Sequence, residues 1–254
     1  MVFISGLSYR LSVKDEPYRS YVWARVQRLV FPVWIFLTLF FTLLALTAYP
    51  MPLPSFYTIW RSYLLVDGIG YVWVIRIFLF VALIGPLVYW YHLRQGSHVW
   101  YLSSLALIYA IYEAMVAWLQ PTDPLTRLLL THVVYYVIPY GLIFAIGLRV
   151  PDLSQAALVG LLALCATGYL AGLGYYGLIQ DGAGWLPTQK FKYPPTSYYL
   201  SFALMMAFVL YLASERIMAL CQQVRLESLI LFIGSNSIWI YLWHILYLQV
   251  FKSL

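Results

Sequence analysis

The chain has 254 residues, of which 63% are hydrophobic and only 9% are charged, and its formal net charge is +6. Soluble domains carry roughly a quarter charged residues, so this composition excludes a soluble globular protein and predicts an all-α, polytopic transmembrane bundle in a single domain over residues 1–254. The excess of lysine and arginine is explained by the orientation of a membrane protein, so no nucleic-acid partner is expected.

The predicted elements begin with a partial helix in MVFISGLSYRLS, where an apolar start precedes a basic turn. Pro194–Pro195 favours a later helix that begins directly after Pro195, because the residue before a proline is pushed out of helical geometry. A helix needs about 20 apolar residues to cross a bilayer. Seven stretches meet this requirement, at 29–49, 69–91, 98–118, 129–148, 155–178, 198–217 and 229–250.

The positive charges between these spans predict the orientation. With the N-terminal segment in the cytoplasm, that side receives nine cationic residues, namely Arg10, Lys14, Arg19, Arg25, Arg28, Arg94, Arg149, Arg216 and Arg225. The opposite side receives five, namely Arg61, Arg127, Lys190, Lys192 and Lys252. The positive-inside rule therefore favours a cytoplasmic N-terminal segment and an outer C-terminus.

Two arginines, Arg25 and Arg28, precede the first long span in the sequence RVQRLVFPVW. Residues three apart project from one side of a helix, so this pair can clamp a phosphorylated ligand bidentately. The alternative is an anchor that orients the protein and meets anionic lipid headgroups.

Four ionisable residues lie inside predicted spans, where a charge costs about 2.5 kcal/mol or more. They are Arg76, Glu113, His132 and His244. The predicted orientation places all four in the outer part of the membrane, which indicates one polar site at that depth. The alternatives are a structural Arg76–Glu113 ion pair, a solvated His132 at the interface and a His244 that is hydrogen-bonded in the core.

The last span contains a polar stripe within GSNSIWIYLWHILYL. In a continuous helix, Gly234, Ser237, Tyr241 and His244 share one face. A polar stripe on a membrane helix must face protein or a water-filled cavity. The stripe therefore predicts an interior site in which Ser237 and Tyr241 contact substrate beside His244.

Metal and disulfide chemistry have no clear signature in the sequence. The histidine, cysteine, aspartate and glutamate residues do not follow metal-ligand spacing, and there is no HExxH motif, so no metal is expected. Cys165 falls in a predicted span and Cys221 in a polar loop. The pair therefore says nothing about the redox compartment.

Four segments resemble the membrane acyltransferase type 3 family, which includes fucose 4-O-acetylases and polysaccharide O-acetyltransferases. They are FISGLSYRL, ARVQRLVFPVW, YVWVIRIFLFVALIGPLV, and KFKYPPTSYYLSFAL together with GSNSIWIYLWHIL. Their order and spacing cover nearly the whole chain. The resemblance implies transfer of an acyl group, usually acetyl, from cytoplasmic acyl-CoA to a sugar hydroxyl, by a multi-pass protein of the bacterial inner membrane.

The same resemblance implies roles for individual residues. Arg25 and Arg28 correspond to the arginine motif that handles the donor, here acetyl-CoA. His244 corresponds to the histidine of the C-terminal pattern and is expected to support catalysis, together with Glu113 and Arg76. The expected partners are the lipid bilayer, acyl-CoA and a carbohydrate acceptor, while the oligomeric state is left open.

Family members begin with a helix that bears an arginine pair and a histidine, and no segment here corresponds to it. The resemblance therefore implies an N-terminally truncated member. This leaves two alternatives beside the acyltransferase. One is a non-catalytic remnant, and the other is a transporter or flippase of an amphiphilic substrate, for which buried polar residues would line the path.

Overall fold

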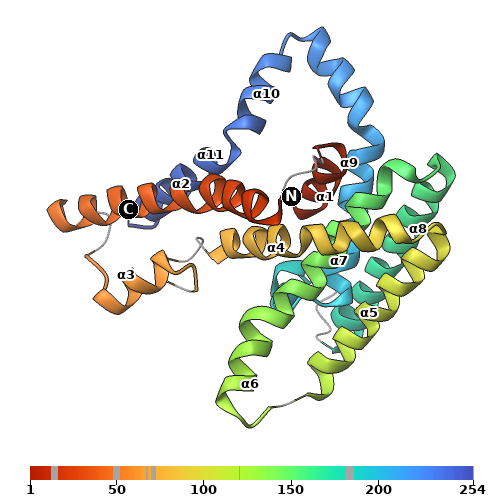
Figure 1. Cartoon of the computed structure of the whole chain (residues 1–254), viewed down its shortest axis with the longest axis horizontal. Helices are drawn as coiled ribbons and strands as arrows, with labels where there is room; N and C mark the ends of the chain where they lie inside the picture. The colour runs from red at the N-terminus through yellow and green to blue at the C-terminus, as the bar shows by residue number, and fades with distance from the viewer. Residues whose placement is uncertain are drawn as a thin grey trace. The chain divides into compact units, whose positions relative to one another are not determined.

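A computed structural model describes residues 1–12, 17–47, 52–66, 68–69, 73–119, 121–180 and 186–253. All its regular elements within these ranges are helices, as Figure 1 shows. Six helices are long and apolar enough to cross a membrane: Tyr18–Thr47, Val74–Arg94, His98–Trp118, Pro124–Asp152, Gln155–Gly177 and Ser197–Gln223. A seventh span exists if the bent pair Glu227–Ser235 and Ser237–Leu248 is counted as one. The predicted all-α membrane fold is confirmed.

The chain forms two compact units. Unit 1 comprises Met1–Lys14 and Ile84–Ile217, and unit 2 comprises Asp15–Leu83 and Met218–Leu254. Helix α4 (Trp73–Arg94) begins in unit 2 and ends in unit 1. Each unit is described by itself.

Unit 1 holds most of the spans. Its elements are α1 (Val2–Ser12), the C-terminal part of α4, α5 (His98–Trp118), α6 (Pro124–Leu129), the π-helix η1 (Leu130–Val134), α7 (Tyr135–Arg149), the 3-10 turn η2 (Val150–Asp152), α8 (Gln155–Leu173), the π-helix η3 (Gly174–Gln180), the 3-10 turn η4 (Thr188–Phe191) and α9 (Ser197–Gln223) up to Ile217. Short connections join successive spans, so neighbouring spans run in opposite directions.

Two glycines let α1 pack directly on the backbone of α7. A side chain on Gly6 would overlap the carbonyl oxygen of Phe144, and one on Gly147 would overlap the carbonyl oxygen of Phe3. Small residues permit this close approach between membrane helices, where dispersion contacts replace the hydrophobic effect. The predicted partial helix at the N-terminus is therefore real and is part of the packed interior of unit 1.

Tyr101 fixes α5 against α7. Its side chain is fully buried, and its hydroxyl donates a hydrogen bond to the carbonyl oxygen of Ala145 at 2.9 Å. Leu105 and Leu142 pack in the same buried cluster. A buried phenol is stable only when its hydroxyl has a partner, and this one binds a backbone oxygen of the neighbouring helix.

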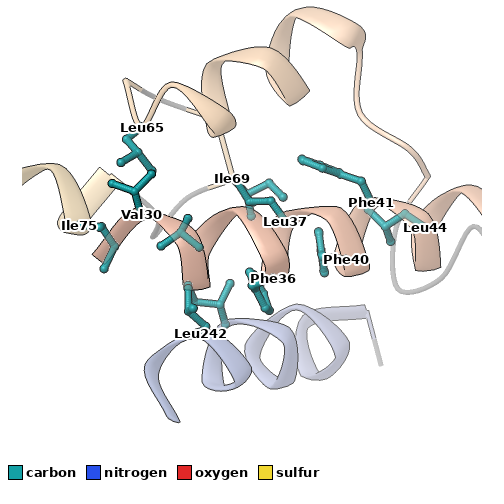
Figure 2. Packing of buried hydrophobic residues seen from close by; sticks show 12 residues of the cluster. Val30, Phe36, Leu37, Phe40, Phe41, Leu44, Leu65, Ile69, Ile75 and Leu242 are labelled. Atoms are coloured by element: carbon teal, nitrogen blue, oxygen red, sulfur yellow. The ribbon is translucent and has the colours of Figure 1, made fainter. Parts of the chain in front are cut away.

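Unit 2 is built around α2 (Tyr18–Thr47), with α3 (Phe56–Tyr63), the first part of α4, α10 (Glu227–Ser235) and α11 (Ser237–Ser253). Figure 2 shows Phe36 of α2 and Leu242 of α11 between the two helices, while Leu65 and Ile69 lie on the other side of α2. The buried residues of α2 recur at helical spacing and are Val30, Val33, Phe36, Leu37, Phe40, Phe41 and Leu44.

Prolines determine where two of the spans begin. Helix α9 begins at Ser197, directly after Pro195 and Thr196, as predicted. Helix α2 follows Pro17 and begins at Tyr18, well before the predicted start at residue 29. The early start has a functional consequence, because it places the arginine pair inside a continuous helix rather than in front of one.

The last predicted span, 229–250, is not a straight helix. Helix α10 ends at Ser235, α11 begins at Ser237, and the two are inclined at 77°. The side chains of Ser235 and Asn236 both donate to the carbonyl oxygen of Phe232, at 3.0 and 2.9 Å. Such local side-chain bonds compete with the helical ladder. The expected four-residue stripe is therefore wrong at Gly234, which lies in α10, before the bend.

Candidate functional site

The alternating spans of unit 1 bring specific helix ends together. One end, which we call the tyrosine end, is formed by the last turns of α5, the start of α7 with η1, the end of α8 with η3, and the first turn of α9. The opposite end, which we call the basic end, is formed by the last turn of α4, the first turn of α5, η2 and the last turn of α1. The charge count predicts that the tyrosine end faces outward.

Glu113 lies at the tyrosine end and has two partners. One of its carboxylate oxygens accepts hydrogen bonds from the hydroxyl of Tyr109 at 3.1 Å and from the backbone N–H of Ser197 at 2.6 Å. The first N–H groups of a helix lack partners within the helix and carry a partial positive charge. Glu113 therefore caps α9 from a neighbouring helix, and the alternative of an ion pair with Arg76, which belongs to unit 2, stays a prediction.

Aromatic rings surround this carboxylate. Tyr112 packs against Tyr109, with ring centroids 5.5 Å apart, and edge-on against Tyr135, at 6.1 Å. Tyr136 lies 5.9 Å from Tyr193 in the segment before α9. The tyrosine end therefore combines one carboxylate with several phenols, a mixture of apolar surface and fixed polar groups that is typical of small-molecule sites.

His132 lies at the same end as Glu113, in the π-helix η1, and is half-buried. Single π-helical turns inside α-helices occur frequently at functional sites. Unit 1 thus contains two of the four ionisable residues predicted to share a depth. The other two, Arg76 and His244, belong to unit 2, so the common cluster stays a prediction.

Charged groups outside the spans also mark the tyrosine end. Burial lowers the pKa of the Lys192 ammonium, which lies 5.2 Å from the ring centroid of Tyr193. The backbone N–H of Thr126 donates to Asp123 at 2.7 Å and holds the pKa of that carboxyl below its ordinary value. Asp123 is the N-cap of α6, and its charge serves that helix end.

The basic end contains a network that the sequence analysis did not identify. Arg149 is 5% exposed, and its guanidinium donates to Nδ1 of His98 at 2.8 Å and to the carbonyl oxygens of His92 and Gly96 at 3.5 and 3.2 Å. These bonds tie the end of α4 to the start of α5. The planar fork of arginine donors suits such multiple contacts, so Arg149 is a structural clamp.

His92 belongs to the same network and is 3% exposed. Its Nε2 lies 3.4 Å from one carboxylate oxygen of Asp152, while Arg10 lies 3.5 Å from the other. Arg10 also donates to the hydroxyl of Tyr89 at 3.5 Å. The sequence signal is a histidine at the end of the span 69–91 and an aspartate shortly after the span 129–148, but nothing in their spacing links them.

The arginine pair lies on α2 in unit 2. Arg25 is half-buried, with its guanidinium carbon 5.2 Å from the ring centroid of Tyr21. Arg28 is exposed and has no hydrogen-bond or ion-pair partner within the described ranges. An exposed guanidinium three residues from a second one retains the geometry expected of a phosphate clamp.

On α11, Ser237, Tyr241 and His244 share one face, as predicted for this part of the stripe. Ser237 and His244 are exposed and Tyr241 is half-buried, whereas Leu242 and Ile245 face the core of unit 2. Because unit 2 is described by itself, the predicted interior site and the alternative of a core histidine both stay predictions.

Arg76 is 8% exposed, and its guanidinium donates to the carbonyl oxygen of Val66 at 3.0 Å. Val66 follows the C-terminus of α3, so Arg76 connects α4 to the chain that leaves α3. A catalytic role for Arg76 stays a prediction. Within the described residues, no group of three or more potential ligands could hold a metal ion.

The six to seven spans, with polar clusters at both ends of unit 1, define a multi-pass membrane protein. The chain belongs to the acyltransferase 3 family: the family model described as an acyltransferase domain matches residues 1–254, as the sequence resemblance implied. No curated protein and no solved structure matches the chain significantly. Membrane acyl transfer is therefore the activity of its family.

Proposed function

We propose that this membrane acyltransferase moves an acyl group, acetyl in the first instance, from acyl-CoA to a hydroxyl of a sugar in a surface glycan or glycoside. The observation that carries the proposal is the acyltransferase match over residues 1–254. The resemblance to fucose 4-O-acetylases supports a sugar acceptor and a bacterial inner-membrane location.

The reaction sets the chemical requirements. The sugar oxygen forms a bond to the acyl carbon, the carbon–sulfur bond of the thioester breaks, and the thiolate takes up a proton. A base must accept the hydroxyl proton. His244 carries an exposed imidazole, and histidine is the side chain that most often serves as a general base. In this proposal it supports proton transfer, while Ser237 and Tyr241 orient the reacting groups.

Arg25 and Arg28 hold the phosphates of the donor in this proposal. Both guanidiniums lie in the first three turns of α2, on the side of the membrane where the charge count predicts the cytoplasm. Arginine binds phosphate through two parallel N–H donors. Coenzyme A carries three phosphates, so each guanidinium of the pair can bind one of them.

Substituting Arg28→Ala is expected to raise the KM for acetyl-CoA about tenfold or more, since a charge-assisted hydrogen bond contributes about 1.5–3 kcal/mol. Purified protein in liposomes, supplied with labelled acetyl-CoA and a sugar acceptor, provides the measurement. Arg216→Ala removes an exposed arginine of α9 on the same predicted side and is the control. Unchanged donor KM in the Arg28 variant would remove it from the donor site.

Transport of an amphiphilic substrate is the competing function. Within the described residues, α10 and α11 form the single bent helix pair that is together long and apolar enough to cross a membrane. Transporters built from inverted repeats place such breaks in corresponding positions of both halves. Sugar uptake into liposomes without any acyl donor would favour transport, and acetyl transfer without uptake would favour the enzyme.

A further inference from the structure

Several hydroxyl groups at the tyrosine end are buried without a hydrogen-bond partner among the described residues, Oη of Tyr140 in α7 among them. Two more belong to residues that are next in the chain to Glu113 or to its partner Ser197. They are Oη of Tyr112, whose side chain is 1% exposed, and Oγ1 of Thr196. An unsatisfied buried polar group costs about 1–3 kcal/mol, so native proteins retain few of them. These two occur on different elements, α5 and the residue before α9, yet at one end of one unit.

Glu113 lies near both residues. It binds the backbone N–H of Ser197, next to Thr196 in the chain. It is also one residue from Tyr112, whose ring lies 5.5 Å from that of Tyr109, the phenol that donates to Glu113. Both described hydrogen bonds of the carboxylate go to Oε1. Oε2 has no hydrogen-bond partner within the described ranges, and the side chain is half-exposed. An ionised carboxylate accepts at both oxygens, so capping α9 leaves half of its capacity unused.

Aromatic rings lie close to the Glu113 carboxylate. Tyr176 lies 4.5 Å from Phe191 and 5.8 Å from Tyr198, measured between ring centroids. Tyr198 directly follows Ser197, whose backbone N–H binds Glu113, so these rings lie close to the carboxylate. A pyranose combines apolar C–H faces with several hydroxyls, each of which can donate and accept. It is the class of ligand that matches apolar rings, a free carboxylate oxygen and hydroxyls without partners.

We propose that Glu113, Tyr112 and Thr196 form the binding site for the sugar of the acceptor, at the tyrosine end of unit 1. This inference rests on the proposed function and adds the site to it. Oε2 of Glu113 accepts a hydrogen bond from one sugar hydroxyl, and other hydroxyls of the same ring pair with Tyr112 and Thr196. Glu113 binds the acceptor and caps α9 with different oxygens.

A purely structural role predicts a different response to mutation. Tyr112→Phe removes a hydroxyl that has no partner, so it should leave the unfolding temperature unchanged or raise it. Under the proposal, the same variant binds the sugar less tightly. Tyr101→Phe is the matched control on the same helix, because its hydroxyl is satisfied by Ala145. That control should lower the unfolding temperature and leave sugar binding unchanged.

Glu113→Gln separates the two uses of the carboxylate. Glutamine keeps a carbonyl oxygen for the N–H of Ser197 but loses the negative charge and one acceptor oxygen. We expect it to remain folded and to bind sugar about tenfold more weakly, because hydrogen bonds to charged groups are the stronger class.

The test measures binding without acyl donor, by saturation-transfer NMR on the full chain in detergent. The probes are the methyl pyranosides of glucose, fucose and rhamnose. Weaker binding by Tyr112→Phe and Glu113→Gln, with unchanged binding by Tyr101→Phe, supports the site. Equal binding by all variants, or no binding by the wild type, overturns it.

A measurement of acetyl transfer separates the site from the function. If the wild type transfers acetyl to one of these sugars and the variants have the same KM for that sugar, the site is wrong and the function stands. If sugar binds at the site and no acetyl is transferred, the function fails and the site stands.

Discussion

Replacing Gly6 or Gly147 with alanine is expected to disrupt the packing of α1 on α7. In each case the new methyl group would overlap a backbone carbonyl of the other helix, at Phe144 or at Phe3. A flexible side chain can move aside, but a helical backbone cannot retreat without separating the two helices. Overpacking of this kind costs typically about 1–3 kcal/mol.

The measurement is the unfolding temperature in detergent, followed by light scattering or by cysteine reactivity. For a chain of this size, about 2–4 °C are lost per kcal/mol, so each variant should unfold several degrees below the wild type. Gly160→Ala in α8 is the matched control, since a methyl group there meets no atom within 4 Å. Equal unfolding temperatures in all three variants would contradict the close approach of α1 and α7.

Replacing Arg149 with methionine is expected to have the other large effect. The substitution keeps much of the side-chain volume but removes the donors that serve His98 and the carbonyl oxygens of His92 and Gly96. The bond to His92 is buried and the other two are part-buried, and a buried acceptor left without a donor costs about 1–3 kcal/mol. Lysine should not rescue the variant, because a single ammonium cannot reproduce the fork of a guanidinium.

Arg94→Ala provides the comparison for this prediction. Arg94 is exposed and stacks over Trp90, with its guanidinium carbon 4.0 Å from the ring centroid. Such an exposed contact contributes about 0.5–1 kcal/mol. The fraction of protein that stays monodisperse on heating should fall strongly for Arg149→Met and Arg149→Lys, and little for Arg94→Ala. If Arg149→Lys unfolds at the wild-type temperature, the clamp does not depend on the guanidinium.

Several elements could be predicted from the sequence because their causes are local. Apolar length determines the spans, so 98–118 was predicted with the bounds that α5 has. Pro195 determines where α9 begins, because the residue before a proline avoids helical geometry. The bend after Ser235 also has a local cause in Ser235 and Asn236, but hydropathy alone conceals it, since both flanking segments are apolar.

The partners of the polar residues were decided by the tertiary structure. Glu113 was identified from sequence as a charge inside a span, but its bonds to Ser197 depend on the placement of α9 beside α5. The pairing of His92 with Asp152, and the meeting of Gly6 with the α7 backbone, join residues far apart in the chain. Membrane insertion depends on the apolar character of each segment, which can be read from the residues of that segment alone. Hydrogen bonds and close backbone contacts depend on distances between segments, which only the folded chain defines.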